Sequence, residues 1–323
     1  MQRRTVLMAL GLSACVPLAW GQAADKVFRV GYVRNERPPE DDIEGFRQGL
    51  RELGYVEGRN VIVEYRWGDG TQPRLRALVE ELVALKVDVI VASAPQASEA
   101  AKVATRSIPI VMVMVADPVG YRLIDNYARP GGNITGFAFL LPEISGKRME
   151  LLKAMLPPLN RVAVLWNGRN PLKKDELTHV EAAAKALKVA VQPVAVEGAA
   201  DIERAFAAAM KIRPGGLITL DDPFTIAHSK VIAGLAARHR LPALYGVKPY
   251  VDQGGLMYYG PDRFDQSRRS ARVVDRLLRG TRPQDIPVER PVKFEMIINM
   301  KVARALGLKI PQSILVQADR LIE

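Results

Sequence analysis

A short polar turn, Ser93-Ala94-Pro95-Gln96, separates an apolar run at 87–91 from a segment with helical spacing. Pro95 suits the first turn of a helix, because its missing N–H would have no partner there. The free backbone N–H groups of a helix start attract anions, and Ser93 or Gln96 could add a side-chain donor. The turn therefore predicts a site for a ligand carboxylate, with a plain helix cap as the alternative interpretation.

Acidic residues followed by proline end two further apolar runs. Asp117 precedes Pro118 at the end of one run, and Asp222 precedes Pro223 at the end of another. Each carboxylate can accept hydrogen bonds from a ligand ammonium, or it can cap the helix that follows. The sequence leaves both interpretations open. Asn167, directly after a third apolar run, is a further candidate donor to a ligand.

Tyrosines at strand ends are candidates for the wall of a pocket, because a tyrosine offers an aromatic face with a polar tip. Side chains alternate across a strand, so only one of Tyr258 and Tyr259 can point into a shared cleft, and we select Tyr259. The candidate ligand-binding residues are therefore Tyr32, Ser93, Ala94, Gln96, Asp117, Asn167, Asp222, Tyr245 and Tyr259.

The sequence offers little for catalysis or for a metal. It has no GxSxG, HExxH or Walker A motif, which carry nucleophilic, zinc and phosphate chemistry. The three histidines are isolated within helical segments, and Cys15 is the sole cysteine. We therefore expect no enzyme, no metal site and no cofactor. The net charge of +11 is spread along the chain without a nucleic-acid-binding motif, so we expect no nucleic-acid partner.

The N-terminal segment has the pattern of a secretory signal peptide. Two arginines precede an apolar stretch, and Gly21-Gln22-Ala23 places small residues where a signal peptidase cleaves. We predict a signal peptide at 1–23, cleaved after Ala23, and a periplasmic location. Two alternatives remain open. The four residues ending at Cys15 resemble a lipoprotein box, which would lipidate this cysteine, and the arginine pair permits twin-arginine export.

Apolar runs of strand length alternate with segments of helical spacing through most of the chain. Such an order, with near-continuous apolar strands, predicts parallel sheets covered on both faces. Ligands bind these sheets outside the carboxyl ends of the strands, which is where most candidate residues lie. The apolar runs lie near 27–33, 61–65, 87–91, 108–115, 134–139, 162–166, 189–196, 216–220, 244–245 and 256–259.

The fold class that we predict is α/β, with two doubly wound parallel-sheet lobes joined by a hinge. The chain crosses between the lobes about three times, and the interface between lobes is a favoured place for a pocket. In the tail we expect a short strand at 292–294 and a helix at 298–306. The predicted first lobe comprises 25–143 plus 262–282, and the predicted second lobe comprises 144–261 plus 283–323.

Several stretches match a known family, in order, along nearly the whole chain after residue 23. They read SAPQASEAAKVATRSIPIVMVMVADPV, ARPGGNITGF, GKRMELLKAMLP, RVAVLWN, GGLMYYGPD and NMKVARALGLKIP. The chain resembles the substrate-binding proteins of bacterial ABC transporters that have the type I periplasmic-binding-protein fold. That group includes tryptophan- and tyrosine-type amino-acid binders. One departure concerns a turn usually written Gly-Thr-Pro in such proteins, which is Ser93-Ala94-Pro95 here.

The resemblance implies an extracytoplasmic protein that captures a small carboxylate-bearing ligand, an amino acid or an aromatic relative. It implies closure of the lobes around the ligand, delivery to the membrane subunits of an ABC permease, and a monomer. A ligand-binding module that serves a membrane sensor or receptor would have the same sequence pattern, so this alternative stays open. Because Ala94 lacks a hydroxyl, the ligand of other members does not transfer directly.

Overall fold

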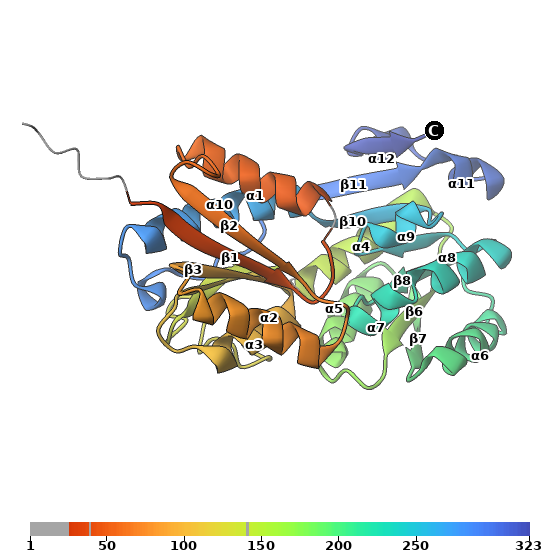
Figure 1. The fold of residues 1–323 in the computed structure, drawn as a ribbon. Helices are drawn as coiled ribbons and strands as arrows, with labels where there is room; N and C mark the ends of the chain where they lie inside the picture. Colours follow the sequence, from red (N-terminus) through yellow and green to blue (C-terminus); the bar gives the residue numbers. More distant parts are fainter. Residues whose placement is uncertain (1–25, 39, 140–141) are drawn as a thin grey trace, which may run out of the picture.

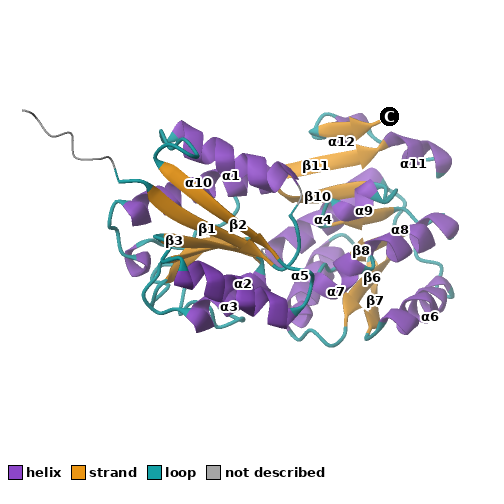
Figure 2. Cartoon of the chain, in the orientation of Figure 1, coloured by secondary structure: helices purple, strands orange, loops and turns teal. Residues whose placement is uncertain are grey.

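The computed structural model describes residues 26–38, 40–139 and 142–323 (Figure 1). The predicted signal peptide, its cleavage site after Ala23 and the lipoprotein alternative at Cys15 lie outside the described residues. Two β-sheets with helices packed on their faces make up the two halves of the molecule (Figure 2). We call these halves the first lobe and the second lobe.

The first lobe contains a five-stranded parallel sheet with the order β2-β1-β3-β4-β5. Val30 of β1 lies beside Val63 of β2 and Val89 of β3, so β-branched side chains stack across neighbouring strands. Every residue of β3, β4 and β5 is buried, as expected for a parallel sheet covered on both faces. The strands are β1 (Phe28–Arg34), β2 (Val61–Trp67), β3 (Val89–Ser93), β4 (Ile110–Val115) and β5 (Ile134–Ala138).

Two helices cover each face of this sheet. Helices α2 and α3 pack on one face, and α1 packs with α10 on the other, although α10 comes from far along the chain. The two helices of the α1–α10 pair approach closely because α1 has glycine at the contact. A Cβ added to Gly49 would lie 2.0 Å from the carbonyl oxygen of Arg268. The bounds are α1 (Glu40–Glu52), α2 (Gln72–Ala84), α3 (Pro95–Ala104) and α10 (Arg263–Leu278).

The second lobe contains a seven-stranded sheet with the order β12-β11-β10-β9-β8-β6-β7. The predicted α/β fold with two parallel-dominated sheets is confirmed, but β10 and β11 are antiparallel. The chain leaves the second sheet at the carboxyl end of β10 and returns at the same edge, where Phe294 pairs with Pro261. Because it re-enters at that edge, β11 must run in the opposite direction. The strands are β6 (Arg161–Asn167), β7 (Ala190–Val196), β8 (Gly216–Thr219), β9 (Ala243–Tyr245), β10 (Met257–Pro261), β11 (Phe294–Asn299) and β12 (Arg320–Ile322).

The tail differs from its predicted structure. The strand extends to Asn299, whereas the sequence predicted a helix from 298. Ile297 and Ile298 are fully buried beside β10, and a short apolar pair fits a strand or a helix equally well when it is read alone. The remaining helical segments are α4 (Pro142–Met155), α5 (Leu172–Ala186), α6 (Ala199–Met210), α7 (Pro223–Ala227), α8 (Ser229–Arg238), α9 (Pro249–Asp252), η1 (Pro283–Asp285), α11 (Met300–Ala305) and α12 (Gln312–Leu315).

Within the described ranges the chain passes between the lobes three times: from β5 to α4, from β10 to α10, and from α10 to β11. The last passage begins later than the predicted boundary at 283. The backbone N–H of Val288 donates to the Tyr127 carbonyl (2.8 Å), and that of Glu289 donates to the Gly136 carbonyl (2.9 Å). The segment up to Glu289 therefore lies against β5 of the first lobe.

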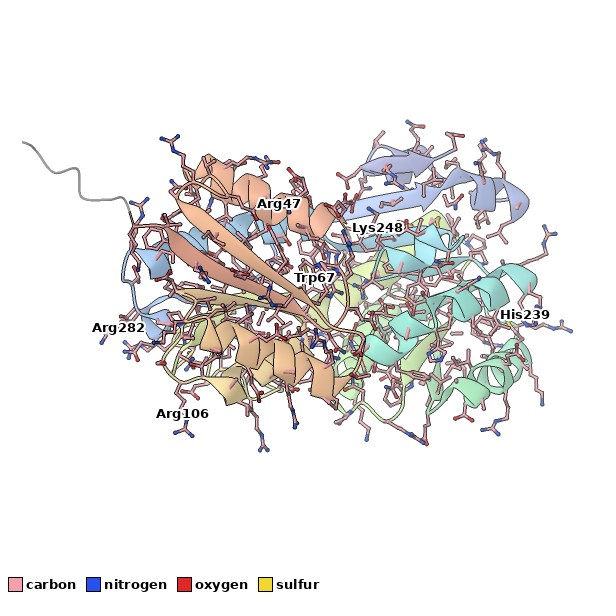
Figure 3. The ribbon with its side chains drawn as sticks, viewed as in Figure 1. Arg47, Trp67, Arg106, His239, Lys248 and Arg282 are labelled. Carbon is pink, nitrogen blue, oxygen red and sulfur yellow. The ribbon has the colours of Figure 1, made fainter. Side chains whose placement is uncertain are left out.

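One ion pair joins the lobes away from these passages. Lys248, at the start of α9, lies at the junction of the two halves (Figure 3). Its Nζ is 3.1 Å from Oδ2 of Asp41 in α1. The two lobes are thus in contact on the side of the molecule where α1 and α9 meet.

Candidate functional site

A cavity of about 420 Å³ lies between the lobes. Its lining comes from residues that follow β1, β3, β4 and β5 on one side and β6, β8 and β9 on the other. Both sheets therefore present the carboxyl ends of their strands to one space. A volume of this size is within the range of pockets that bind small molecules.

The turn between β3 and α3 forms part of the first-lobe wall, where Ala94, Pro95 and Gln96 all line the cavity. Ala94 has φ 79° and ψ 160°, a combination that is essentially restricted to glycine. Hydrogen bonds hold it there: its N–H donates to the Val113 carbonyl (2.8 Å) and its carbonyl accepts from the N–H of Ser98 (3.2 Å). The first N–H groups of α3 have no partner within the helix, so this strained turn presents donors at the cavity wall.

Ser93 does not line the cavity. It is fully buried, and its hydroxyl neighbours that of Tyr32 without meeting the geometry of a hydrogen bond. Tyr32 is also buried, with its ring edge-on to Phe46 of α1. Burial, followed by the nearby Asp42 carboxylate, raises the pKa of Tyr32 to about 12. Of the predicted acid site, the structure thus brings Ala94 and Gln96 to the cavity and leaves Ser93 behind its wall, together with Tyr32, which was predicted to line the pocket.

Two arginines of the first-lobe wall share one carboxylate, and the sequence analysis missed all three residues. Arg263, the first residue of α10, donates from Nε to Oδ1 of Asp42 (3.0 Å) and from Nη2 to Oδ2. Arg34, the last residue of β1, donates from Nη1 to the same Oδ2 (3.3 Å). Both arginines line the cavity, and Asp42 is 1% exposed. Burial and then the neighbouring Arg263 lower the pKa of Arg34.

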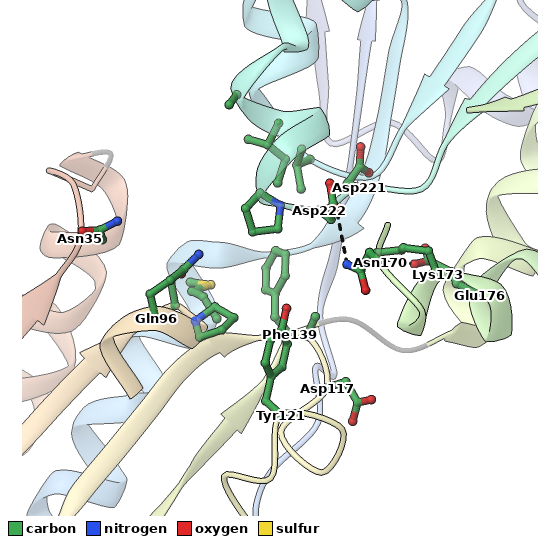
Figure 4. Close-up of a pocket in the computed structure, with 18 of the residues that line it drawn as sticks. Asn35, Gln96, Asp117, Tyr121, Phe139, Asn170, Lys173, Glu176, Asp221 and Asp222 are labelled. Carbon is green, nitrogen blue, oxygen red and sulfur yellow. Dashed lines mark hydrogen bonds and ion pairs between the residues drawn. The ribbon is translucent and has the colours of Figure 1, made fainter. Parts of the chain in front are cut away.

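Asp117 and aromatic side chains complete the first-lobe wall. Asp117 lines the cavity, and its Oδ1 accepts from the N–H of Gly120 (2.9 Å). Tyr121, Tyr127 and Phe139 also line it, and Figure 4 shows Tyr121 and Phe139 between Gln96 and the residues of the second lobe. These residues, rather than the predicted tyrosines, supply the aromatic surface of the cavity.

Asp222 lines the cavity from the second lobe, but its oxygens already have partners. Its Oδ1 accepts from the N–H of Thr225 (2.9 Å) and caps α7. Its Oδ2 accepts from Nδ2 of Asn167 (2.7 Å). The same oxygen accepts from Nδ2 of Asn170 (3.2 Å), as Figure 4 shows. Asn167 is therefore held by Asp222 and does not line the cavity, whereas Asn170 does.

A buried ionic network lies beneath the second-lobe wall. Lys173 is 2.6 Å from Oε2 of Glu176, and Nη1 of Arg148 is 3.6 Å from Oε1 of the same carboxylate. Arg148 is completely buried. Although burial opposes it, the two cations, Lys173 before Arg148, hold the pKa of Glu176 below its ordinary value. Lys173 and Glu176 reach the cavity, so this network is part of the site.

Asp221 completes the same network. Its Oδ1 accepts from the Thr219 hydroxyl (2.7 Å), and its Oδ2 accepts from the N–H of Gly246 (2.8 Å). Burial raises the pKa of Asp221 to about 6, against the opposing effect of Arg148. Gly246 has no room for a side chain, because a Cβ would lie 2.3 Å from both Cζ of Arg148 and Oδ2 of Asp221.

The strand-end tyrosines of the second lobe are packing residues. Tyr245 is fully buried and stacks on Tyr250 with ring centroids 4.4 Å apart. Tyr259 stacks on Phe294 at 5.9 Å and packs against the core of the second lobe. Neither lines the cavity, and Tyr258 donates instead to the Pro261 carbonyl (2.9 Å). All lie within strands, whereas most of the cavity lining follows the strand ends.

No group of three or more histidine, cysteine or acidic side chains is arranged to hold a metal ion in the described part of the chain. Among the helices of that part, none has the length and apolar character needed to cross a membrane.

Comparisons with known proteins agree on one family. Residues 37–322 match the ABC transporter substrate binding protein family. A tyrosine-binding protein of Clostridioides difficile is 25% identical over 265 residues, which cover 82% of this chain and 76% of that protein. A conserved domain protein of Vibrio cholerae has a similar structure, with a TM-score of 0.80 and 25% identity over 92% of this chain and 100% of the other.

A Streptococcus pneumoniae ABC domain solved in complex with L-Trp has the same fold. Its TM-score is 0.80, with 24% identity over 91% of this chain and 99% of the other. The two-lobed architecture is that of the type I periplasmic binding proteins. Because the family match covers nearly all of the described residues, this chain belongs to the ABC transporter substrate-binding proteins.

Proposed function

We propose that this extracytoplasmic solute-binding protein captures an amino acid or an aromatic relative in the cavity between its lobes and delivers it to an ABC permease. The observation that carries the proposal is the shared cavity, whose walls come from the carboxyl ends of both sheets. A ligand held there contacts both lobes at once. A relative named as a tyrosine-binding protein and a similar structure in complex with L-Trp support this ligand class.

The two ends of such a ligand suit different parts of the cavity. The start of α3, with Gln96 beside it, offers donors for a carboxylate. Asp117 has one carboxylate oxygen that accepts from a backbone N–H, and it lies on the lining with capacity for a ligand ammonium. The aromatic residues Tyr121 and Phe139 offer surface for an apolar side chain.

Closure of the lobes around the ligand is part of the proposal. We assign 26–139 and 263–289 to the first lobe, and 142–261 and 294–323 to the second. Three passages between lobes can serve as a hinge. Small-angle scattering of the protein with and without saturating ligand should show a smaller radius of gyration in the bound state.

Export and assembly complete the proposal. The signal peptide at 1–23 directs the chain to the periplasm, and the mature protein acts as a monomer without catalytic turnover. Mass spectrometry of protein recovered from the periplasm should find an N-terminus at Ala24. A diacylated Cys15 would instead establish a lipoprotein.

A thermal-shift screen of the purified mature protein tests the ligand class directly. Amino acids, aromatic acids without an amine and aromatic amines without an acid are compared at equal concentrations. Ligands that bind the folded state raise its melting temperature, and at equal concentration a tighter ligand gives a larger shift. We expect an aromatic amino acid to give the largest shift and to be recovered unchanged. A largest shift from an amine without an acid group would reject the proposal.

A further inference from the structure

We infer that Arg34, held in place by Asp42 and Arg263, binds the acid group of the ligand and so makes an acid group a requirement of this site. This inference rests on the proposed function, which it deepens by naming the residue that selects the ligand class. The sequence pattern did not single out this arginine.

The first argument is charge balance at the cavity wall. The guanidinium groups of Arg34 and Arg263 form ion pairs only with Asp42 among the described residues. Two positive charges therefore share one negative charge. Glu36 also lines the cavity, but it is exposed and forms no ion pair with Arg34. A carboxylate in the cavity would restore the balance.

The second argument is the number of hydrogen-bond donors. Asp42 is fully engaged by Arg263 through both oxygens, while Arg34 donates a single bond to it. An arginine has five N–H donors, so Arg34 keeps several for another acceptor. The hydroxyls of Tyr32 and Ser93 neighbour each other in the same region, but both are buried behind the cavity wall. Of Arg34, Tyr32 and Ser93, only Arg34 lines the cavity, so its remaining N–H groups are the donors that a ligand can reach.

The third argument is location. Arg34 ends β1, and the register that pairs Val33 with Ala92 puts Arg34 next to the turn that begins α3. Arg34 and Gln96 both line the cavity. The guanidinium and the helix start therefore act on one acid group, with two N–H donors of Arg34 suited to the two oxygens of a carboxylate.

The second-lobe wall does not offer an equivalent acid site. Its cations, Lys173 and Arg148, are matched by the carboxylates of Glu176 and Asp221. A ligand carboxylate there would add a negative charge to a balanced network. On the first-lobe wall, where Glu36 and Asp117 also lie, the positive excess is confined to the buried cluster in which Arg34 and Arg263 share Asp42.

Isothermal titration calorimetry on the mature protein tests the inference with three probes. They are L-tyrosine, tyramine, which lacks the carboxylate, and 3-(4-hydroxyphenyl)propionate, which lacks the amine. We expect Arg34→Met to weaken both acids by about 10- to 140-fold, since a hydrogen bond to a charged group is worth roughly 1.5–3 kcal/mol and 1.4 kcal/mol is tenfold. Tyramine should bind the variant and the wild type equally.

Arg66→Met is the matched control. Arg66 lies near the end of the neighbouring strand β2, where it pairs in register with Val33. Its side chain is 24% exposed against 22% for Arg34, and it donates to Glu81 (3.0 Å) rather than lining the cavity. This variant should bind all three probes as the wild type does. Arg34→Lys, which keeps the charge but loses the planar fork, should bind the acids with an affinity between those of wild type and Arg34→Met, and it remains informative if the methionine variant does not fold.

Three results would overturn the inference. The first is wild-type affinity of Arg34→Met for both acids, or of Arg34→Lys where only that variant folds. The second is an equal loss for tyramine and the acids, which would indicate a structural role. The third is a wild-type protein that binds neither acid. If the wild type binds the propionate but not L-tyrosine, the proposed amino-acid ligand fails, while the propionate alone decides the role of Arg34.

Discussion

The cavity wall of the first lobe and that of the second lobe both contain buried charges, but they differ in how these charges are matched. In the first, Arg34 and Arg263 share Asp42. In the second, Arg148 and Lys173 lie among three buried carboxylates, Glu176, Asp221 and Asp222, and every oxygen of these carboxylates accepts from a protein donor. The comparison indicates that the second wall is built to hold its own shape, whereas the first has capacity left for a ligand.

The two walls also differ in backbone strain. Ala94 and Met114, both on the first-lobe lining, have positive φ values of 79° and 60°. Strain of this kind persists only where surrounding structure enforces it, and it concentrates at functional sites. The first lobe therefore combines unsatisfied donors with strain in a turn and in a strand, and the second combines a satisfied network with a regular helix cap at Asp222.

Removing one cation from each wall tests most directly whether the two walls differ in charge matching. Arg148→Met should lower the free energy of unfolding by about 3–5 kcal/mol, because it leaves buried carboxylates without their partner. Arg34→Met should change it by no more than about 1 kcal/mol, because Asp42 keeps both bonds to Arg263 and an unmatched charge is removed. Urea unfolding measures both, and equal losses would mean that the walls do not differ in charge matching.

The pH dependence of stability tests the environment of Asp221 in the second-lobe wall. Its folded-state pKa is raised to about 6 from its ordinary value of 3.8, so the folded state binds more protons than the unfolded state between these pH values. The stability due to the neutral carboxyl is therefore complete below about pH 4 and is lost as pH rises through about 6. Relative to Asp221→Asn, the wild type should lose up to about 3 kcal/mol from pH 4 to pH 7. If the stability difference between the wild type and Asp221→Asn stayed constant across this range, burial would not favour the neutral carboxyl of Asp221.

A glycine substitution tests how tightly the second-lobe network is packed. Gly246→Ala should destabilise the protein by about 1–3 kcal/mol, since the new methyl group overlaps Arg148 and Asp221 and forces the network apart. Gly234→Ala in α8 is the matched control, because no atom lies within 4 Å of its added Cβ. It should stabilise the helix by up to about 1 kcal/mol. Thermal unfolding measures both variants. Melting temperatures that shifted in the same direction for Gly246→Ala and Gly234→Ala would contradict the packing argument.

The smallest effect is expected for relief of strain in the first-lobe wall. Ala94→Gly should raise the free energy of unfolding by about 0.5–2 kcal/mol, because glycine removes a strain of roughly 1–3 kcal/mol and adds a smaller entropy cost. Ala100→Gly, in the regular part of α3, should lower it by up to about 1 kcal/mol. Denaturant titration measures both variants. If Ala94→Gly lowered the free energy of unfolding as much as Ala100→Gly does, the backbone at Ala94 would not be strained.

Part of the site could be predicted from residue order. Ala94, Gln96, Asp117 and Asp222 follow apolar strands, and all four line the cavity. The rule that ligands bind outside the carboxyl ends of parallel strands was sufficient for them. The signal for Arg34 was of the same kind, since it is the last residue of β1, but a single arginine at a strand end is also common on a solvated surface.

The predicted residues that do not line the cavity lie within their strands, before the strand end, or their side chains point away from the cavity. Tyr245 and Tyr259 are strand residues whose rings pack on neighbouring aromatics. Ser93 and Tyr32 lie beneath α1 and α10, and α10 begins at Arg263, far later in the chain than either residue. No local pattern specifies which side chains such a distant helix covers.

The sequence by itself determined the alternation of strands and helices, the two-sheet architecture and the strand edge at which the cavity lies, because these depend on local hydrophobic periodicity and on the direction of parallel strands. The tertiary structure alone decided the direction of β11, which follows from where the chain re-enters the second sheet. It also decided the charge balance of each wall. Asp42 and Arg263 are 221 positions apart, and whether a charge is matched or left for a ligand depends on which distant partners the packed lobes bring within bonding distance.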